Sequence, residues 1–289
     1  MTTNNRTVLV GTDGSPAARA AVRWAADEAH RRNTVLTILY AFTPEWVVDD
    51  NLPERRYVDL GAEHAEVVLA DAEMDAHGVS ADLEVRRMAV AGSPASLLLE
   101  AARSAAVAVV GHRGHGAFED LLLGSVGQAV AAHAGCPVAV VRGRADLSSG
   151  PVLVGVDPSP AGSHAVELAF DQAGSRGCGL VALRAFRSPA PPWGADIAPS
   201  VVHLEEQLDL ERRLLDEVLQ PWRTKYPQVP VETRMSRFDA ARALIEASCG
   251  AQLLVAGSRG SGHLAGNLFG SVSLHLLRHA ACPVLVAHA

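Results

Sequence analysis

The chain has 289 residues, of which 48% are hydrophobic and 20% charged, and its formal net charge is −7. The composition is typical of a globular protein, and the length predicts two domains that each bury a core of their own. The negative charge argues against binding to DNA or RNA, because affinity for a nucleic-acid backbone comes mainly from clustered Lys and Arg. Lys225 is the only lysine, which excludes the P-loop motif, whose lysine must reach the β- and γ-phosphates.

The chain carries no sign of export or of a membrane anchor. Its start lacks a basic segment followed by a long apolar one, and no apolar run approaches the roughly 18 residues that would span a bilayer. We therefore expect a cytoplasmic protein with no membrane partner. The four cysteines contain no CxxC pair, which argues against a disulfide scaffold or a zinc knuckle.

In the first half of the chain, short β-branched runs alternate with longer Ala- and Leu-rich stretches. The expected strands are 8–10, 35–39, 83–90, 107–110 and 138–141. Ser15 followed by Pro16 predicts the start of the first helix, and Ser93 predicts a cap before a later one. Nearly all-apolar strands that alternate with helices indicate a parallel sheet covered on both faces. We therefore expect a doubly wound α/β domain with about five strands.

The second half of the chain repeats the first. The glycine motif Gly111, Gly114, Gly124, Ser125 recurs 146 residues later as Gly257, Gly260, Gly270, Ser271, and Asp13 after the first strand recurs 144 residues later as Asp157. A duplication of this length predicts two tandem domains rather than a solenoid of short repeats. The expected boundaries are 1–143 for the first domain, 144–150 for the linker and 151–289 for the second domain.

The repeated motifs lie where an open parallel sheet binds ligands, beyond the carboxyl ends of its strands. A glycine loop that ends at a helix N-terminus presents backbone N–H groups and the positive end of the helix dipole, which suit phosphate oxygens. Ser125 and Ser271 can add hydroxyl donors. Asp13 and Asp157 suit ribose hydroxyls, or a divalent cation that bridges phosphates.

These motifs resemble those of the ATP-binding universal stress proteins, and the resemblance extends over nearly all of the chain. It implies five-stranded parallel sheets of order 3-2-1-4-5 flanked by helices. It also implies adenine against the end of the second strand, ribose and metal near the first-strand aspartate, and triphosphate in the glycine loop. Proteins of this kind act mainly as nucleotide-dependent regulators of stress and growth, and marked ATP hydrolysis is not a general property.

Carried over to this chain, the resemblance implies two nucleotide-binding sites. In the first domain the expected residues are Gly11, Asp13, Ala41, Val90, Gly111, Arg113, Gly114, Gly124, Ser125 and Val126. In the second domain they are Gly155, Asp157, Ala185, Met235, Gly257, Arg259, Gly260, Gly270, Ser271, Val272 and Ser273. Asp13 and Asp157 are also the expected ligands of Mg²⁺ or Mn²⁺, and no residue is assigned a catalytic role.

The two expected sites are not identical. The first glycine loop contains Glu119 and Asp120, where the second has small residues, and Pro158 of the second domain removes one backbone N–H donor. Repulsion between carboxylates and a triphosphate outweighs the loss of one hydrogen bond. We therefore expect the second site to bind ATP more tightly.

The sequence favours an ATP-binding regulator of the stress response, and three alternatives remain open. They are a slow ATPase or phosphotransfer protein, a cyclic-AMP binder, and an interaction scaffold with a vestigial pocket. The last strand of each domain, after Cys136-Pro137 and Cys282-Pro283, would be an exposed apolar edge if it were unpaired. We therefore expect the two strands to face each other within one chain as an internal pseudo-dimer, and the chain to pair further into a homodimer.

Overall fold

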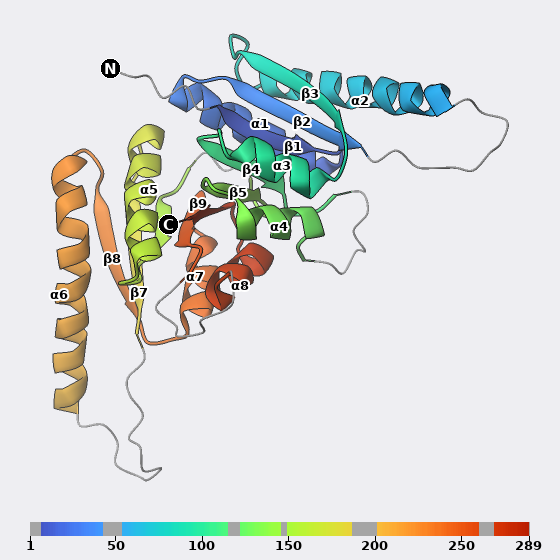
Figure 1. Cartoon of the computed structure of the whole chain (residues 1–289). Helices are drawn as coiled ribbons and strands as arrows, with labels where there is room; N and C mark the ends of the chain where they lie inside the picture. Colours follow the sequence, from blue (N-terminus) through green and yellow to red (C-terminus); the bar gives the residue numbers. More distant parts are fainter. Residues whose placement is uncertain are drawn as a thin grey trace, which may run out of the picture. The chain divides into compact units, whose positions relative to one another are not determined.

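The computed structural model describes residues 7–42, 54–114, 122–145, 149–186, 201–259 and 269–288, with the backbone alone at 54–60 and 201–204. The chain divides into two compact units, built mainly from the residues before and after position 146. Each unit alternates strands and helices (Figure 1). The expected α/β fold is therefore confirmed.

The first unit holds a parallel sheet. Its elements are β1 (Val8–Thr12), α1 (Pro16–Arg32), β2 (Leu36–Phe42), α2 (Glu54–His77), β3 (Val85–Ala91), α3 (Pro94–Ala102), β4 (Val107–Gly111), α4 (Ser125–His133) and β5 (Val138–Val141). The strands lie in the order β3-β2-β1-β4-β5. The register places Val8 of β1 beside Leu36 of β2 and Val107 of β4, so β1 occupies the middle of the sheet.

The burial of these strands follows from the helices that cover them. Helix α1 contacts α2, and α3 contacts α4, and strands β1, β4 and β5 are almost wholly buried. The edge strand β3 is different, because most of its residues, including Arg86 and Arg87, are exposed. Charged side chains on an edge strand hinder pairing with a foreign strand.

The second unit repeats this plan. Its elements are β6 (Val152–Gly155), α5 (Pro160–Arg176), β7 (Leu180–Ala185), α6 (Val201–Lys225), β8 (Val231–Ser236), α7 (Ala240–Ser248), β9 (Leu253–Gly257), α8 (Ser271–His279) and β10 (Val284–Ala287). The strands lie in the order β8-β7-β6-β9-β10. Strand β6 pairs in parallel with both β7 and β9, as β1 pairs with β2 and β4.

Serine caps start the first helix of each unit. The Ser15 hydroxyl accepts the N–H of Ala18 at 3.2 Å, and the Ser159 hydroxyl accepts the N–H of Gly162 at 3.1 Å. Ser93 lies at the cap position of α3, but its side chain makes no capping hydrogen bond. The predicted cap position at Ser93 is therefore confirmed without a capping hydrogen bond, and Pro94 at the first helical position favours this start of the helix.

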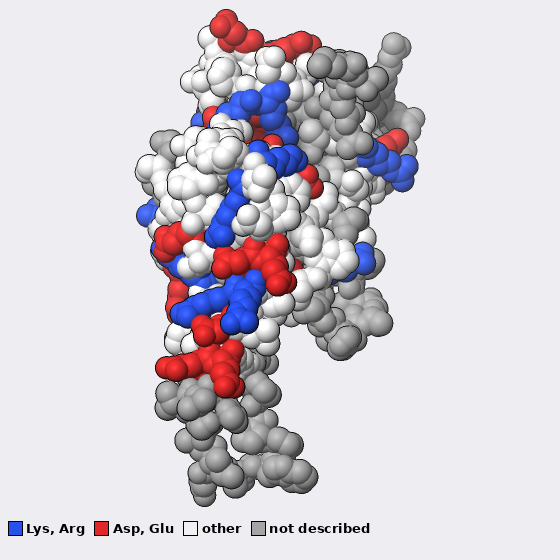
Figure 2. Space-filling model, turned by 90° about the vertical axis from the view of Figure 1, so that its left-hand side faces the viewer, with Lys and Arg blue, Asp and Glu red and all other residues white. Residues whose placement is uncertain are grey.

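The surface carries both signs of charge. Figure 2 shows Lys and Arg side chains interspersed with Asp and Glu on the face that it presents. In the second unit, for example, Arg223 pairs with Asp216 at 3.0 Å and Arg234 pairs with Glu232 at 2.7 Å. Within the described ranges, no helix is both long enough and apolar enough to span a bilayer.

Candidate functional site

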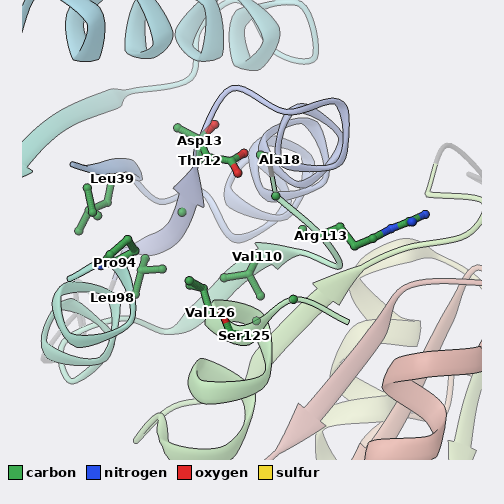
Figure 3. A pocket seen from close by; sticks show the side chains of 16 residues that line it. Thr12, Asp13, Ala18, Leu39, Pro94, Leu98, Val110, Arg113, Ser125 and Val126 are labelled. Atoms are coloured by element: carbon green, nitrogen blue, oxygen red, sulfur yellow. The ribbon is translucent and has the colours of Figure 1, made fainter. Parts of the chain in front are cut away.

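A cavity of about 320 Å³ opens at the carboxyl ends of β1, β2 and β4 in the first unit. It lies between the loop after β1, the start of α3 and the start of α4 (Figure 3). Its apolar lining consists of Ala18, Leu39, Ala41, Pro94, Leu98, Val110 and Val126, and the remaining lining of Gly11, Thr12, Asp13, Gly111, Arg113, Gly114, Gly124, Ser125 and Gly127. The position is the one at which open parallel sheets bind ligands.

The loop after β1 holds the Asp13 carboxylate at this cavity. The N–H of Ser15 donates to Asp13 Oδ1 at 3.0 Å, and the N–H of Gly14 donates to the Thr12 hydroxyl at 3.2 Å. Gly14 has φ +80°, a conformation that glycine adopts without strain. Burial raises the pKa of the nearby Tyr40 hydroxyl, and the negative charge of Asp13 raises it further.

Backbone hydrogen bonds hold together the two ends of the glycine loop, which runs from Gly111 to Gly124. The N–H of Gly124 donates to the His112 carbonyl at 2.8 Å, and the N–H of His112 donates to the Val141 carbonyl at 3.0 Å. Helix α4 then begins at Ser125. The loop therefore leads into a helix N-terminus, whose first N–H groups have no partner within the helix and suit an anion.

The side chain of His112 lies beside these backbone hydrogen bonds. Burial lowers its pKa, a hydrogen bond with the Val141 carbonyl opposes that change, and the charges of Arg113 and Arg142 lower the pKa further. The neutral imidazole is therefore favoured at neutral pH. In the second unit Ser258 replaces His112, and the N–H of Gly270 donates to the Ser258 carbonyl at 2.8 Å, as Gly124 does to His112.

Several glycines of the motifs are required by packing. A Cβ on Gly11 would lie 2.8 Å from Leu98 Cδ1, and a Cβ on Gly111 would lie 2.8 Å from the backbone of Ala17. Gly155 and Gly257 have equivalent close contacts with Leu244 and Ala161, at 2.8 and 2.9 Å. Close contact with backbone therefore accounts for Gly111 and Gly257, whereas Gly11 and Gly155 face only the ends of leucine side chains, which can move.

Gly114 differs from them, because its missing side chain faces the site. A Cβ there would overlap the Asp13 carboxylate. Asp13 therefore lies directly against the first turn of the glycine loop. Elements that are about a hundred residues apart in the sequence, the loop after β1 and the loop after β4, meet at this point.

The cavity gathers nearly all of the residues expected for the first site. All of them line it except Val90, which lies in β3 beside Ala41. Arg113 lines the cavity, but its exposed side chain extends away from the other labelled side chains (Figure 3). The sequence interpretation missed the apolar wall of Leu39, Pro94 and Leu98, although a helix start after the third strand marks the place of the last two.

In the second unit the structure describes most of the expected residues. Asp157 Oδ1 accepts the N–H of Ser159 at 2.8 Å, as Asp13 does with Ser15. Ser271 is the first residue of α8, after Gly270 at the cap position, and it is exposed, as is Arg259. Gly260 lies outside the described residues, as do Glu119 and Asp120 of the first glycine loop.

Two expected residues of the second unit have other surroundings than the sequence suggested. Ala185 at the end of β7 pairs with Ser236, whereas Met235 pairs with Arg184. The register position of Val90 therefore belongs to Ser236, and Met235 faces the other side of the sheet. Ser273 is 4% exposed, and its hydroxyl donates to the Gly257 carbonyl at 2.6 Å, which is a bond within the fold.

Among the residues that the structure describes, the side chains around either aspartate do not form a metal site by themselves. Across the described part of the chain, no group of three or more His, Cys, Asp and Glu side chains could hold a metal ion. A cation at Asp13 or Asp157 would need ligands beyond these described side chains, and water or the phosphates of a bound nucleotide can supply oxygen ligands.

Comparison with known proteins decides the family. A sequence model of the Universal stress protein family matches residues 4–142 and again residues 149–288. The chain belongs to the universal stress protein family. The two matches also confirm the tandem arrangement, and membership associates the protein with the stress response.

Universal stress proteins of similar length resemble this one over almost the whole chain. One from Mycolicibacterium smegmatis is 38% identical, and the comparison covers 96% of each chain. One from Mycobacterium tuberculosis is 36% identical, with 97% of this chain and 96% of the relative covered. The crystal structure of a universal stress protein from Archaeoglobus fulgidus superposes with a TM-score of 0.72 at 21% identity, covering 100% of this chain and 99% of the other, which supports the fold.

Proposed function

We propose that this universal stress protein binds ATP together with Mg²⁺ or Mn²⁺ and acts as a nucleotide-dependent regulator in a stress response. The observation that carries the proposal is the cavity of the first unit, in which an apolar wall and a helix N-terminus face the same space. An adenine nucleotide needs both surfaces, since its base is largely apolar and its phosphates are anionic.

The apolar wall suits the base. Leu39, Pro94 and Leu98 come from β2 and α3 and line one part of the cavity, and the burial of flat apolar surface there would be favourable. Ligand pockets of about 300 to 1,000 Å³ are usual, so a volume of about 320 Å³ is enough for a nucleoside with the phosphates directed toward the glycine loop.

The glycine loop and Asp13 suit the rest of the molecule. The N–H groups at the start of α4 and the Ser125 hydroxyl can bind phosphate oxygens. The Asp13 carboxylate would repel bare phosphate, so it fits either ribose hydroxyls or a divalent cation whose remaining ligands are phosphate oxygens and water. Asp157 has the corresponding place in the second unit.

Substitution of Gly114 by Ala tests the proposal. The added Cβ would overlap the Asp13 carboxylate and displace either the loop or the aspartate, so we expect ATP–Mg²⁺ affinity at the first site to fall at least about tenfold, or about 1.4 kcal/mol. The measurement is calorimetric titration of the full chain. Gly135→Ala is the matched control, because a Cβ there meets nothing within 4 Å; equal ATP binding by both variants would refute the site.

Two further measurements on the purified full chain distinguish the alternative functions. Mass spectrometry of ligand released from the purified, denatured protein distinguishes ATP from cyclic AMP, which has a single phosphate. Release of phosphate from ATP over hours measures slow hydrolysis. If neither nucleotide binds, the protein is an interaction scaffold.

We also propose that the chain forms an internal pseudo-dimer and then a homodimer. The proposal rests on the apolar strands β5 and β10, whose residues are buried and which would otherwise be sheet edges open to pairing. Crosslinking between cysteines introduced at Val140 and Val286 tests the internal pairing. Sedimentation velocity tests the homodimer.

A further inference from the structure

Helix α8 of the second unit carries two histidines one turn apart on its exposed side. His275 and His279 are four residues apart and both exposed. Their ring centroids are 5.0 Å apart, and their planes differ by 36°. The pair lies outside the cavity described above and has no part in the proposed nucleotide site.

The separation of the rings fits the chelation of one metal ion. A metal–nitrogen bond of about 2.0–2.1 Å places each imidazole centroid about 3.2 Å from the metal. Two such rings have centroids about 4.5 Å apart at a right angle and about 5.2 Å apart at a tetrahedral angle, by the same geometry. The observed 5.0 Å lies between these two values.

The chemistry of the donors selects the class of ion. Neutral imidazole suits Zn²⁺, Ni²⁺ and Cu²⁺, whereas Mg²⁺ and Ca²⁺ prefer oxygen ligands. Two histidines at i and i+4 on one helix face form the same pair of ligands that zinc proteases use. With two protein ligands, the site is weaker than one with three or four. The positive charge of Arg278, the residue before His279, also opposes a cation.

We propose that His275 and His279 bind one borderline divalent cation of the first transition row, Zn²⁺, Ni²⁺ or Cu²⁺, with water or a second copy of the chain completing the coordination. The first unit lacks this site. At the equivalent positions of α4 it has Ala129 and His133, and the His133 ring lies 3.0 Å from the Ala129 carbonyl. Helix α4 of the first unit, with one histidine at these two positions, is therefore a control for metal binding by α8.

The test is titration of the tag-free full chain with Zn²⁺ alone and with Ni²⁺ alone. We expect His275→Ala and His279→Ala each to lower the affinity at least about tenfold, because either one destroys the chelate. His133→Ala should bind like the parent chain. Circular dichroism of these variants confirms that the exposed substitutions leave the fold intact.

A gain-of-site variant provides the converse test. Ala129→His places a second histidine one turn from His133, and we expect it to add one equivalent of bound metal. Cu²⁺ bound to the parent chain should also show two coupled imidazole nitrogens by electron paramagnetic resonance. Unchanged binding in the His275→Ala and His279→Ala variants would overturn the proposal, as would a failure of Ala129→His to add a site.

Discussion

Gly162 lies in the first turn of α5, and a Cβ there would overlap the backbone carbonyl of Asp157. The first unit has Ala18 at this position and Gly14, with φ +80°, in the preceding loop. In the second unit Pro158 replaces Gly14. Because proline fixes φ near −65°, the chain cannot follow the same path, and the Asp157 carbonyl instead lies against the helix. The replacement of Gly14 by Pro158 therefore requires the replacement of Ala18 by Gly162, which has no Cβ to meet the Asp157 carbonyl.

Substitution of Gly162 by Ala should destabilise the second unit. In an open helical position this change stabilises by up to about 1 kcal/mol, but overlap with backbone typically costs about 1–3 kcal/mol. We expect a net loss of about 1–2 kcal/mol, measured by urea unfolding. Gly174→Ala in the same helix is the control, because its Cβ would have ordinary contacts at 3.5 Å, and it should stabilise. Equal stabilisation by both changes would contradict this account.

At the scale of elements, some helices begin with a side-chain cap and others begin without one. Ser15 caps α1 through the N–H of Ala18, whereas the Ser93 side chain makes no such bond at α3. Ser15→Ala should therefore lower the free energy of unfolding by about 1 kcal/mol, and Ser93→Ala should leave it nearly unchanged. Thermal unfolding of the two variants makes the comparison, and similar losses would show that the cap at Ser15 has no special role.

Helices α1 and α2 are joined by a carboxylate held between two arginines. Asp75 of α2 accepts hydrogen bonds from Arg19 at 2.7 Å and from Arg23 at 3.1 Å, and its side chain is 12% exposed. Burial by itself would raise the pKa of Asp75, but the hydrogen bonds and charges of the two arginines outweigh it, so the pKa is lowered. The ionised carboxylate therefore stabilises the folded chain.

The sign of this pKa shift fixes how stability depends on pH. The contribution is complete above the pKa of the unfolded chain, about 4, and it is lost as the pH falls through the lower folded-state value. Asp75→Asn should cost about 1 kcal/mol at pH 7, since both arginines are half exposed. The difference from the parent chain should narrow below pH about 4 in unfolding curves, and a difference that grows there would contradict the assignment.

At the scale of the whole molecule, the chain repeats one set of motifs, and the two copies differ in charge and in the loop after the first strand of each unit. Glu119 and Asp120 of the first glycine loop lie outside the described residues, so the expected order of affinities remains a prediction. A carboxylate about 6 Å from a phosphate costs about 2–3 kcal/mol at an effective dielectric of about 20. The donor that Pro158 removes is worth about 1 kcal/mol.

We therefore predict that the second site binds ATP more tightly, by about tenfold or more. Separate titrations of Asp13→Ala and Asp157→Ala variants decide it. The Asp157→Ala chain should lose the tighter binding event, and the Asp13→Ala chain should lose the weaker one. If the tighter event survives the loss of Asp157, the predicted order is wrong.

The sequence by itself determined the tandem repeat, the α/β class, and the loop and helix that meet at Gly124 and Ser125. These features depend on local patterns, since apolar alternation, capping residues and glycine spacing act within a few turns of chain. The same reasoning located Asp13 and Asp157 at strand ends. It could do so because Asp13 directly follows a buried strand and Asp157 lies two residues after the end of another.

Only the tertiary structure decided which distant side chains share the cavity. Leu39, Pro94 and Leu98 meet there because β2 and α3 pack beside β1, and no local pattern specifies that neighbourhood. Whether Ser236 or Met235 lies beside Ala185 depends on the register of β8 against β7, where a shift of one residue reverses the face of the sheet. Whether a glycine is required by packing or by the site depends on the atoms that a Cβ would meet. These are backbone atoms of Ala17 for Gly111 and the Asp13 carboxylate for Gly114. In both cases the atoms belong to another part of the chain.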